Sequence, residues 1–317
     1  MWDWGAYFIM NFKKKNIRKK TQMSHGLAAN GRFQQRMSPV HAGVELKKQH
    51  CCQRSESLRV LIESTFLSEE CRHVHRNSCQ RSVKLRVSSA CTMMVELQER
   101  VTELENWKDG KGLIIHGTGN TFCSGSDLNV VKEISNSQDG MNMCMFMQNT
   151  LTRLMRLPLI SVALVQGKAF GGGAELTTAC DFRLMTPGSE IRFVHKHMGL
   201  VPGWGGGARL VRIVGSGAAL QLLGGAARVD PERALSLGLS EETLLSSDET
   251  GALGEARAWL GQYTEGPAAV IRAVKKVVAA GRELPLEAAL RTEKDIFGTV
   301  WGGPANLQAL VRRPKHK

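Results

Sequence analysis

Two short apolar runs, each leading into a glycine-rich loop, constrain the fold of this chain more than any other feature. Residues 159–165 read Leu-Ile-Ser-Val-Ala-Leu-Val, and the chain then passes through Gly167 into a glycine triplet at 171–173. Residues 112–117 (GLIIHG) form a similar run before a Gly/Ser/Asn-rich loop at 117–126. Short apolar runs bounded by glycines are typical of strands that are buried on both faces. The sequence therefore predicts two central strands with a loop at the end of each.

Helical patterns surround these strands, and the alternation predicts an α/β fold. Apolar residues recur at three- and four-residue steps after residue 90, as on one face of a helix. Asp230-Pro231-Glu232 predicts a helix start with Asp as N-cap and Pro at the first helical residue. The predicted helices cover residues 90–104, 139–156, 174–180, 231–238, 267–278 and 287–297, and a third strand covers residues 182–185.

The positive charge of the chain is concentrated in its first third. The formal net charge is +13, but residues 1–90 hold 17 Lys/Arg against 6 Asp/Glu, whereas residues 91–317 hold 25 against 23. Charge-driven binding is therefore expected only of the N-terminal segment. Its densest run, at 13–20, is typical of a solvated stretch; a nuclear-localisation patch, a nucleic-acid arm and a mitochondrial presequence are the alternatives.

The cysteines predict reduced thiols rather than a disulfide framework. Five of the eight, including Cys71 and Cys79, lie in or next to the basic segment, and no signal peptide is evident. A cytosolic protein is the default, with the mitochondrion as the alternative. The cluster Cys71-Arg72-His73-Val74-His75 has zinc-ligand chemistry but lacks the usual paired spacings, so no metal site is predicted. No apolar run is long enough to predict a transmembrane helix.

The two glycine/serine loops are the candidate ligand-binding elements. Small residues in them allow backbone N–H groups to approach a ligand closely. The second loop also opens a helix, whose free amides favour negative charge. Together the loops could hold an oxyanion. Neither loop matches a dinucleotide or P-loop fingerprint, and the first is not a GxSxG nucleophile elbow, so Ser126 is not interpreted as a hydrolase serine.

Three long segments resemble the central signature of the crotonase (enoyl-CoA hydratase/isomerase) superfamily. They are GLIIHGTGNTFCSGSDL (112–128), LISVALVQGKAFGGGAELTTACDFRLMT (159–186) and IRFVHKHMGLVPGWGGGARL (191–210). The resemblance extends over about 225 residues, from near Cys91 to the C-terminus. It implies a spiral of ββα units. We expect a basic, Cys-rich and largely disordered segment at 1–90, a crotonase core at 91–230 and a helical oligomerisation region at 231–317.

The resemblance also implies the residues of the site. Two backbone N–H groups, by motif position those of Ser126 and Gly172, would hold the thioester oxygen of an acyl-coenzyme A. Members of the superfamily share a thioester enolate, which such an oxyanion hole stabilises. The remaining substrate-binding residues are expected to be Ser124, Asp127, Leu128, Gly171 and Trp204.

Two side chains decide which reaction is expected. Glu175 stands where hydratases carry one catalytic glutamate, and His195 stands where they carry the second. Hydration needs one group to activate water and another to protonate carbon. Decarboxylation of a malonyl-type thioester produces the enolate without a base, so an imidazole that donates a proton is enough. The resemblance therefore implies a decarboxylase acting on ethylmalonyl-CoA or methylmalonyl-CoA, with no cofactor besides the coenzyme A of the substrate.

Ordinary structural roles remain open for these residues. Glu175 could be a carboxylate that favours the dipole of its own helix, and His195 and His197 could be plain strand or loop residues. Trp204 lies between two glycines and is expected to line the acyl pocket, with an exposed loop aromatic as the alternative. The alternating methionines at 141–147 are expected to fill the core.

Residues 1–90 depart from the superfamily pattern. A crotonase begins with a β-hairpin and an Asn-Ala loop, and no matching strands are evident before residue 90, so the first helix is expected to begin directly at about Ala90. The core sheet would then have an exposed edge, and coenzyme A affinity and the activity of this form would suffer.

The expected partners are an acyl-CoA substrate and further copies of the chain in a homotrimer or hexamer, with neither membrane nor nucleic acid. Two alternatives stay open: an enoyl-CoA hydratase or isomerase, and a non-catalytic crotonase-fold protein with a basic N-terminal arm that binds nucleic acid or a partner.

Overall fold

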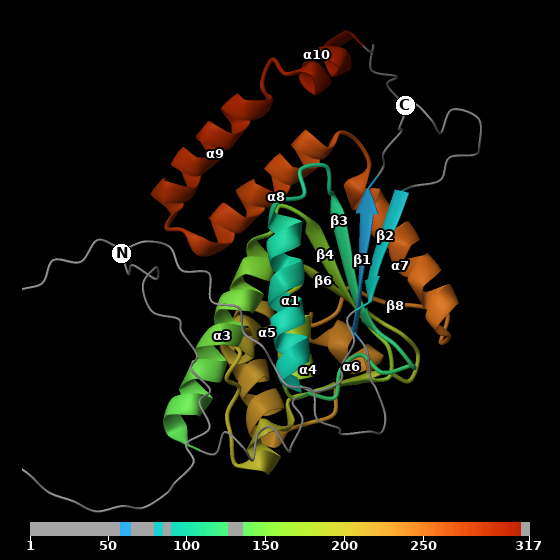
Figure 1. Ribbon diagram of the computed structural model, residues 1–317, viewed down its shortest axis with the longest axis vertical. Helices are drawn as coiled ribbons and strands as arrows, with labels where there is room; N and C mark the ends of the chain where they lie inside the picture. The colour runs from blue at the N-terminus through green and yellow to red at the C-terminus, as the bar shows by residue number, and fades with distance from the viewer. Residues whose placement is uncertain (1–57, 65–78, 85–89, 126–135, 312–317) are drawn as a thin grey trace, which may run out of the picture. The chain divides into compact units, whose positions relative to one another are not determined.

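The computed structural model describes residues 58–64, 79–84, 90–125 and 136–311, all within the unit Cys51–Lys317. Figure 1 shows these elements with their labels. The basic run at 13–20, the Cys/His cluster at 71–75 and most of the N-terminal segment that was expected to be disordered lie outside these ranges.

A six-stranded sheet in the order β2-β1-β3-β4-β6-β8 forms the centre of the described fold. Its strands are β1 (Leu58–Ser64), β2 (Cys79–Lys84), β3 (Gly112–Gly117), β4 (Ile160–Val165), β6 (Phe182–Met185) and β8 (Glu242–Thr243). Strands β3, β4, β6 and β8 run parallel, and β1 pairs antiparallel with both β2 and β3. The two apolar runs singled out by the sequence are therefore β3 and β4, side by side at the centre.

The prediction that no strands precede residue 90 is wrong. β1 pairs with β3 from Leu58 opposite Gly117 to Glu63 opposite Gly112, and β2 forms a hairpin with β1. The edge of β3 that was expected to be exposed is therefore covered. β2 has the polar sequence CQRSVK, which gives no strand pattern, whereas the β-favouring run of β1, LRVLIES, was overlooked.

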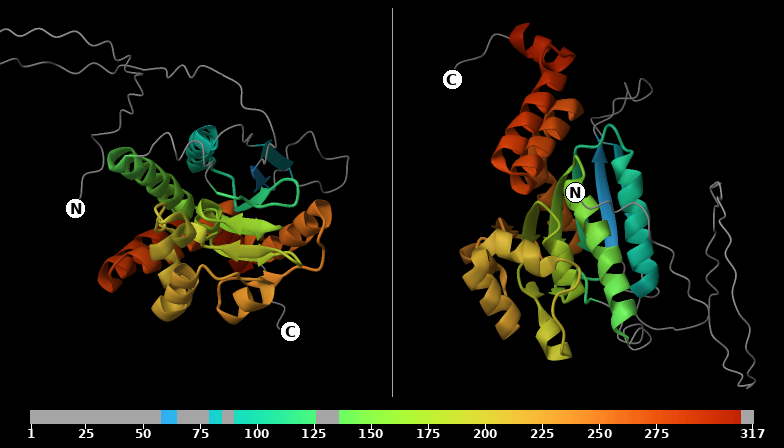
Figure 2. Two further views of the ribbon diagram at one scale, coloured as in Figure 1. Left: turned by 90° about the horizontal axis from the view of Figure 1, so that it is seen from below. Right: turned by 90° about the vertical axis from the view of Figure 1, so that its left-hand side faces the viewer.

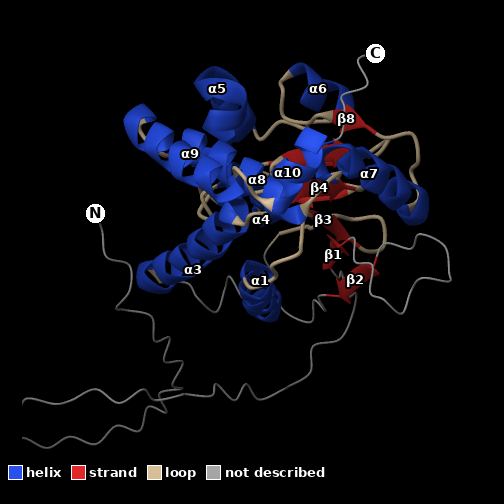
Figure 3. Ribbon diagram, turned by 90° about the horizontal axis from the view of Figure 1, so that it is seen from above, coloured by secondary structure: helices blue, strands red, loops and turns tan. Residues whose placement is uncertain are grey.

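Helices lie on both faces of the sheet, as Figure 3 shows from above, and an apolar layer fills the space on each face. Residues at odd positions of the central strands, such as Leu113 and Ala163, pack with α1 (Ala90–Glu105) and α3 (Ser137–Arg156). Residues at even positions, such as Ile114 and Val162, pack against α7 (Glu249–Thr264). Burial on both faces explains why these strands are apolar throughout rather than alternating.

The remaining helices follow the sheet in the chain. They are α4 (Gly172–Thr177), α5 (Gly206–Gly225), α6 (Pro231–Ser236), α8 (Ala268–Glu283), α9 (Leu286–Val300) and α10 (Pro304–Val311), with a short 3-10 helix η2 (Val194–Met198). The expected start of α6 is confirmed, since the Asp230 side chain accepts a hydrogen bond from the Arg233 N–H. Between residues 231 and 311 the chain is helical apart from β8 and the connecting segments, and Figure 2 shows α9 and α10 extending away from the sheet beyond α8.

A buried ion pair fastens α8 to the sheet. The Lys275 ammonium, on a side chain only 4% exposed, is hydrogen-bonded to the Asp181 carboxylate. Asp181 also accepts hydrogen bonds from the backbone N–H and hydroxyl of Ser161 in β4 (2.8 and 2.9 Å). Burial lowers the pKa of Lys275, and the neighbouring Asp181 opposes that shift.

Replacing Lys275 by Met is expected to lower the free energy of unfolding by about 3 kcal/mol, because it leaves the partly buried Asp181 carboxylate with only the more distant Arg282, at 3.8 Å, as a counter-charge. Chemical denaturation of the full chain measures the change. Lys276→Met, at the exposed neighbouring lysine, is the matched control. Equal stability of the two variants would show that the ion pair does not hold α8.

Candidate active site

The glycine triplet after β4 leads directly into the site. The chain leaves β4, forms the short strand β5 (Lys168–Phe170), and enters α4 with Gly171 as its N-cap. β5 pairs in parallel with β7 (Glu190–Arg192) in a small second sheet, and both short strands were missed by the sequence analysis. All six residues of α4 are buried, and Glu175 is its fourth residue, 1% exposed.

The buried carboxylate of Glu175 is the centre of a hydrogen-bond network. Its Oε2 accepts from the backbone N–H groups of Trp204 and Gly206, each at 2.8 Å. Its Oε1 lies 2.9 Å from Nε2 of His195 and accepts more weakly from the Gly203 N–H at 3.3 Å. Since the three backbone partners are all donors, both oxygens act as acceptors, and Nε2 of His195 is then the fourth donor.

This network gives Glu175 a wider structural role than the one considered from the sequence. Glu175 is in the first turn of its own helix α4, and its carboxylate also reaches the beginning of α5, where Gly206 is the first helical residue. There it satisfies amides that a helix leaves without internal partners. Glu175 therefore links two helices and faces the side chain of His195.

The structure brings the two predicted catalytic side chains, Glu175 and His195, into direct contact. His195 lies in η2, which is held against the end of α5: the Lys196 ammonium donates to the Gly224 carbonyl (2.6 Å), and the Arg192 side chain donates to that of Ala226 (2.8 Å). The His195 side chain is 13% exposed, and its buried Nδ1 has no hydrogen-bond partner among the described residues. One imidazole nitrogen is thus held by Glu175, and the other is buried without a described partner.

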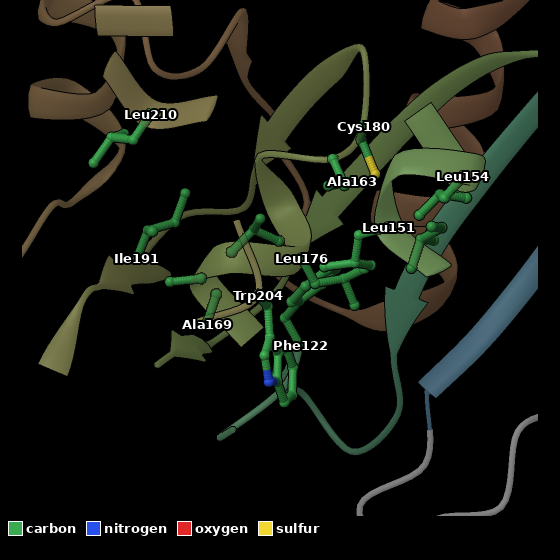
Figure 4. Packing of buried hydrophobic residues seen from close by; sticks show 14 of the residues in the cluster. Phe122, Leu151, Leu154, Ala163, Ala169, Leu176, Cys180, Ile191, Trp204 and Leu210 are labelled. Atoms are coloured by element: carbon green, nitrogen blue, oxygen red, sulfur yellow. The ribbon is translucent and has the colours of Figure 1, made fainter. Parts of the chain in front are cut away.

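The Trp204 indole packs against Gly172, one of the two predicted oxyanion donors. It is 4% exposed, so the alternative of an exposed loop aromatic is wrong. Figure 4 shows it within the first apolar cluster, together with Phe122, Ala169 and Leu176. A methyl group placed on Gly172 would lie 2.4 Å from a carbon of the Trp204 ring, so the indole packs directly against this glycine. The Gly172 N–H is in the first turn of α4 and has no acceptor within that helix.

The first glycine loop runs beside the second. Phe170 donates its N–H to the Cys123 carbonyl at 2.9 Å, and Cys123 and Ala169 form an isolated parallel bridge. A Cβ atom placed on Gly125 would lie 3.5 Å from the Gly172 nitrogen. The residue before Ser126 is therefore adjacent to the second predicted donor.

The other predicted substrate-binding residues have different placements. Ser124 is exposed on the first loop, and the Gly171 N–H donates to the Arg192 carbonyl at 3.0 Å. Ser126, Asp127 and Leu128 lie outside the described residues, so their predicted roles stay predictions.

Arg209 is a residue of the site that the sequence analysis missed. Its buried guanidinium donates to the Thr178 hydroxyl (3.0 Å) and to the Trp204 carbonyl (2.9 Å). Burial lowers its pKa to about 10, and the charge of Glu175 opposes that shift. Arg209 therefore supports the loop that holds Glu175. An arginine within an otherwise small and apolar segment, GWGGGARL, was the available signal.

Residues near the site that were expected to be ordinary have mixed placements. His197 is exposed on η2. Met147 is buried and Met143 packs against the core as expected, whereas Met141 and Met145 are about half exposed, so the packing prediction is wrong for these two. In the described part of the chain, no helix is both long and apolar enough to cross a membrane, and no three His, Cys, Asp or Glu side chains cluster as metal ligands would.

Comparison with known families decides the classification. The sequence profile of the enoyl-CoA hydratase/isomerase family matches residues 88–302. The chain belongs to the enoyl-CoA hydratase/isomerase family. This confirms the resemblance seen in the sequence motifs.

Family members of high identity carry one name. The chain is 88% identical over 224 residues to ethylmalonyl-CoA decarboxylase of Gallus gallus. The aligned residues cover 71% of this chain and 75% of that protein. It is 64% identical over 223 residues to the protein of that name from Homo sapiens (70% of this chain, 73% of that protein).

Solved structures of family members share the fold. Enoyl-CoA hydratase from Bacillus anthracis superposes with a TM-score of 0.64 at 25% identity, covering 69% of this chain and 84% of that one. Enoyl-CoA hydratase from Thermoplasma volcanium superposes with a TM-score of 0.65 at 23% identity. The superposition covers 74% of this chain and 94% of that one. The predicted crotonase-like α/β fold is confirmed.

Proposed function

We propose that this chain is an acyl-CoA decarboxylase that releases CO₂ from ethylmalonyl-CoA, and from methylmalonyl-CoA as a second substrate. The observation that carries the proposal is the contact between Glu175 and His195, in which an imidazole occupies the place of a second catalytic carboxylate. The names of relatives at 64% and 88% identity support it.

The proposed reaction needs charge stabilisation first and a proton second. The bond between the α-carbon and the carboxylate breaks, CO₂ leaves, and the bonding electron pair becomes the thioester enolate. The N–H groups of Ser126 and Gly172 hold the negative thioester oxygen. His195 then gives a proton to the α-carbon, and Glu175 holds its Nε2 and orients the ring. Ethylmalonyl-CoA thus yields butyryl-CoA, and solvent returns the proton to His195.

The same geometry argues against water addition. A hydratase needs a group that removes a proton from water while a second group protonates carbon. Both oxygens of Glu175 are already engaged by backbone N–H groups and by His195, which leaves this carboxylate poorly suited to activate water.

The test is CO₂ release from ethylmalonyl-CoA by the purified full-length chain, with butyryl-CoA identified as the product. Hydration of crotonyl-CoA is measured in parallel. Turnover of ethylmalonyl-CoA together with negligible hydration supports the proposal. Hydration without CO₂ release would replace it by the hydratase alternative, and neither activity in a folded protein would favour a non-catalytic role.

His195→Gln is expected to lower kcat for CO₂ release by about 100-fold, because the variant has no proton to give to the enolate. KM is expected to change little, since the oxyanion donors are untouched. Steady-state kinetics measure both constants, and His197→Gln, on the exposed neighbour in η2, is the matched control. Similar kcat values in the two variants would remove His195 from the mechanism.

Assembly into a homotrimer or hexamer is part of the proposal. Large apolar side chains are exposed along α8, α9 and α10, including Val278, Leu290, Phe297, Trp301 and Leu310. An apolar surface of this kind favours association with a second copy. Light scattering of the full chain measures its mass in solution, and a monomer would overturn this part.

No further cofactor is proposed, because the proposed reaction uses only groups of this chain and the coenzyme A of the substrate. A cytosolic role in acyl-CoA metabolism is proposed, with the mitochondrion as the alternative that cell fractionation tests.

A further inference from the structure

One peptide group connects helix α3 to the buried carboxylate of the site. It consists of the Gly203 carbonyl and the Trp204 N–H. The N–H donates to Oε2 of Glu175 at 2.8 Å. The carbonyl accepts a hydrogen bond at 2.8 Å from Nε2 of Gln148, a side chain of α3. Because the N–H and C=O of a trans peptide lie in one plane and point in opposite directions, Gln148 and Glu175 hold this group from opposite sides.

The second strong amide donor to Glu175 is oriented in a different way. The Gly206 N–H belongs to the peptide group that contains the Gly205 carbonyl. That carbonyl accepts the Arg209 N–H at 3.1 Å, so helix α5 itself orients this amide. The peptide group before Trp204 precedes the helix, and the side-chain contact on its carbonyl comes from α3.

The glycines on both sides of Trp204 explain why an external contact matters. Gly205 has a φ of 85°, in the left-handed region that favours glycine. Gly203 has no side chain either, so the peptide group between Gly203 and Trp204 can rotate with little steric hindrance. Such a rotation would turn the Trp204 N–H away from Glu175. The hydrogen bond from Gln148 to the carbonyl opposes it.

The same carboxylate orients the imidazole of the site. Oε1 of Glu175 lies 2.9 Å from Nε2 of His195, whose side chain is 13% exposed. The terminal torsion of a glutamate has only broad preferences, so a carboxylate that loses one N–H donor can turn and carry the imidazole with it. A displacement of a reacting group by about 1 Å can lower a rate by about 100-fold. The hold on the peptide group before Trp204 therefore bears on the position of His195.

We propose that Gln148 is a positioning residue that fixes the peptide group before Trp204 and so keeps Glu175 facing the imidazole. Gln148 is exposed on α3 and acts through the backbone of the loop, so it is not a catalytic residue. The kinetic consequence of this inference rests on the proposed decarboxylase function, whereas the chain of contacts does not depend on the substrate.

Gln148→Met is expected to lower kcat for CO₂ release about tenfold and to leave KM within about twofold of the wild type, because the variant cannot donate to the Gly203 carbonyl but leaves the oxyanion donors in place. Gln148→Lys should bring kcat back to within about twofold of the wild type, since its ammonium can donate to the same carbonyl. Gln, Met and Lys have similar helix propensities, so denaturant titration should give similar stabilities.

The matched control is Gln138→Met, at an exposed glutamine in the first turn of α3, which should leave kcat unchanged.

Two further measurements distinguish positioning from a merely structural role. In a His195→Gln background, Gln148→Met should change kcat by less than about twofold, because residues that act through one another are not additive. In the full-length chain labelled with isotope-enriched histidine, NMR detects the ring N–H of His195, assigned by its loss in His195→Gln. This signal should weaken in Gln148→Met and return in Gln148→Lys.

The outcomes separate this inference from the proposed function. A folded wild-type chain that releases no CO₂ from ethylmalonyl-CoA would overturn the proposed function, while the ring N–H signal would still test the role of Gln148. An unchanged signal in Gln148→Met, or an unchanged kcat in an active enzyme, would overturn the inference. Equal losses of kcat in Gln148→Met and Gln148→Lys would also overturn it, and so would an undiminished loss in the His195→Gln background.

Discussion

Glu175→Gln is expected to lower kcat for CO₂ release by about 1,000-fold, within the range of a lost proton-transfer partner combined with disturbed electrostatics. The carboxylate accepts hydrogen bonds from the N–H groups of Trp204, Gly206 and Gly203. A glutamine amide has the same shape but replaces one acceptor oxygen by an NH₂ donor. If that donor faces His195, the imidazole loses its acceptor; if it faces the N–H groups of Trp204 and Gly206, two donors meet two donors and the loop is disturbed. In either orientation the negative charge beside His195 is lost.

The same substitution is expected to lower the free energy of unfolding by roughly 1–3 kcal/mol, because a buried donor is left without an acceptor. Stopped assays give kcat and denaturant titration gives the stability. Glu241→Gln is the matched control: Glu241 accepts from the Arg183 guanidinium at 2.9 Å, away from the site, so this variant should lose stability and keep its activity. Equal kcat values in the two variants would contradict the role given to Glu175.

The sequence was sufficient to predict the elements whose formation depends on the pattern of their own residues. β3 and β4 were predicted because they are apolar throughout. Both faces of these strands are buried, one against α1 and α3 and the other against α7. The start of α6 was predicted because an Asp-Pro pair caps a helix through local contacts alone.

Elements with little pattern of their own could not be predicted. β2 is polar and is held by pairing with β1, and β5 and β7 are too short to show a pattern of alternation. The apolar run of β1, LRVLIES, was readable and was overlooked. In the site, the sequence pointed to Glu175 and His195 as separate candidates. It could not show that the amides of Trp204 and Gly206, 29 and 31 residues further along the chain, hold the carboxylate. Those contacts follow from the path of the loop before α5, which tertiary packing sets.

Gly173→Ala is expected to lower kcat/KM by about 100- to 1,000-fold, comparable to the loss of one oxyanion donor. A methyl group on Gly173 would lie 2.2 Å from the Cys123 carbonyl oxygen, which is backbone and cannot turn aside. The same carbonyl accepts the Phe170 N–H that joins the two glycine loops. Moving Cys123 away therefore carries Gly125, the residue before Ser126, away from Gly172. The two predicted donors would no longer converge on one oxygen.

The appropriate control is Gly254→Ala in α7, where an added Cβ meets nothing within 4 Å. Alanine is favoured over glycine in an exposed helix, so this variant is expected to be more stable by about 0.5–1 kcal/mol and fully active. Binding of butyryl-CoA, measured by calorimetry on the folded fraction, separates a displaced donor from general unfolding. A displaced donor weakens binding and turnover together in a protein that still unfolds cooperatively. Wild-type affinity and turnover in Gly173→Ala would instead show that the two loops adjust independently, and the assignment of Ser126 and Gly172 as one oxyanion hole would not stand.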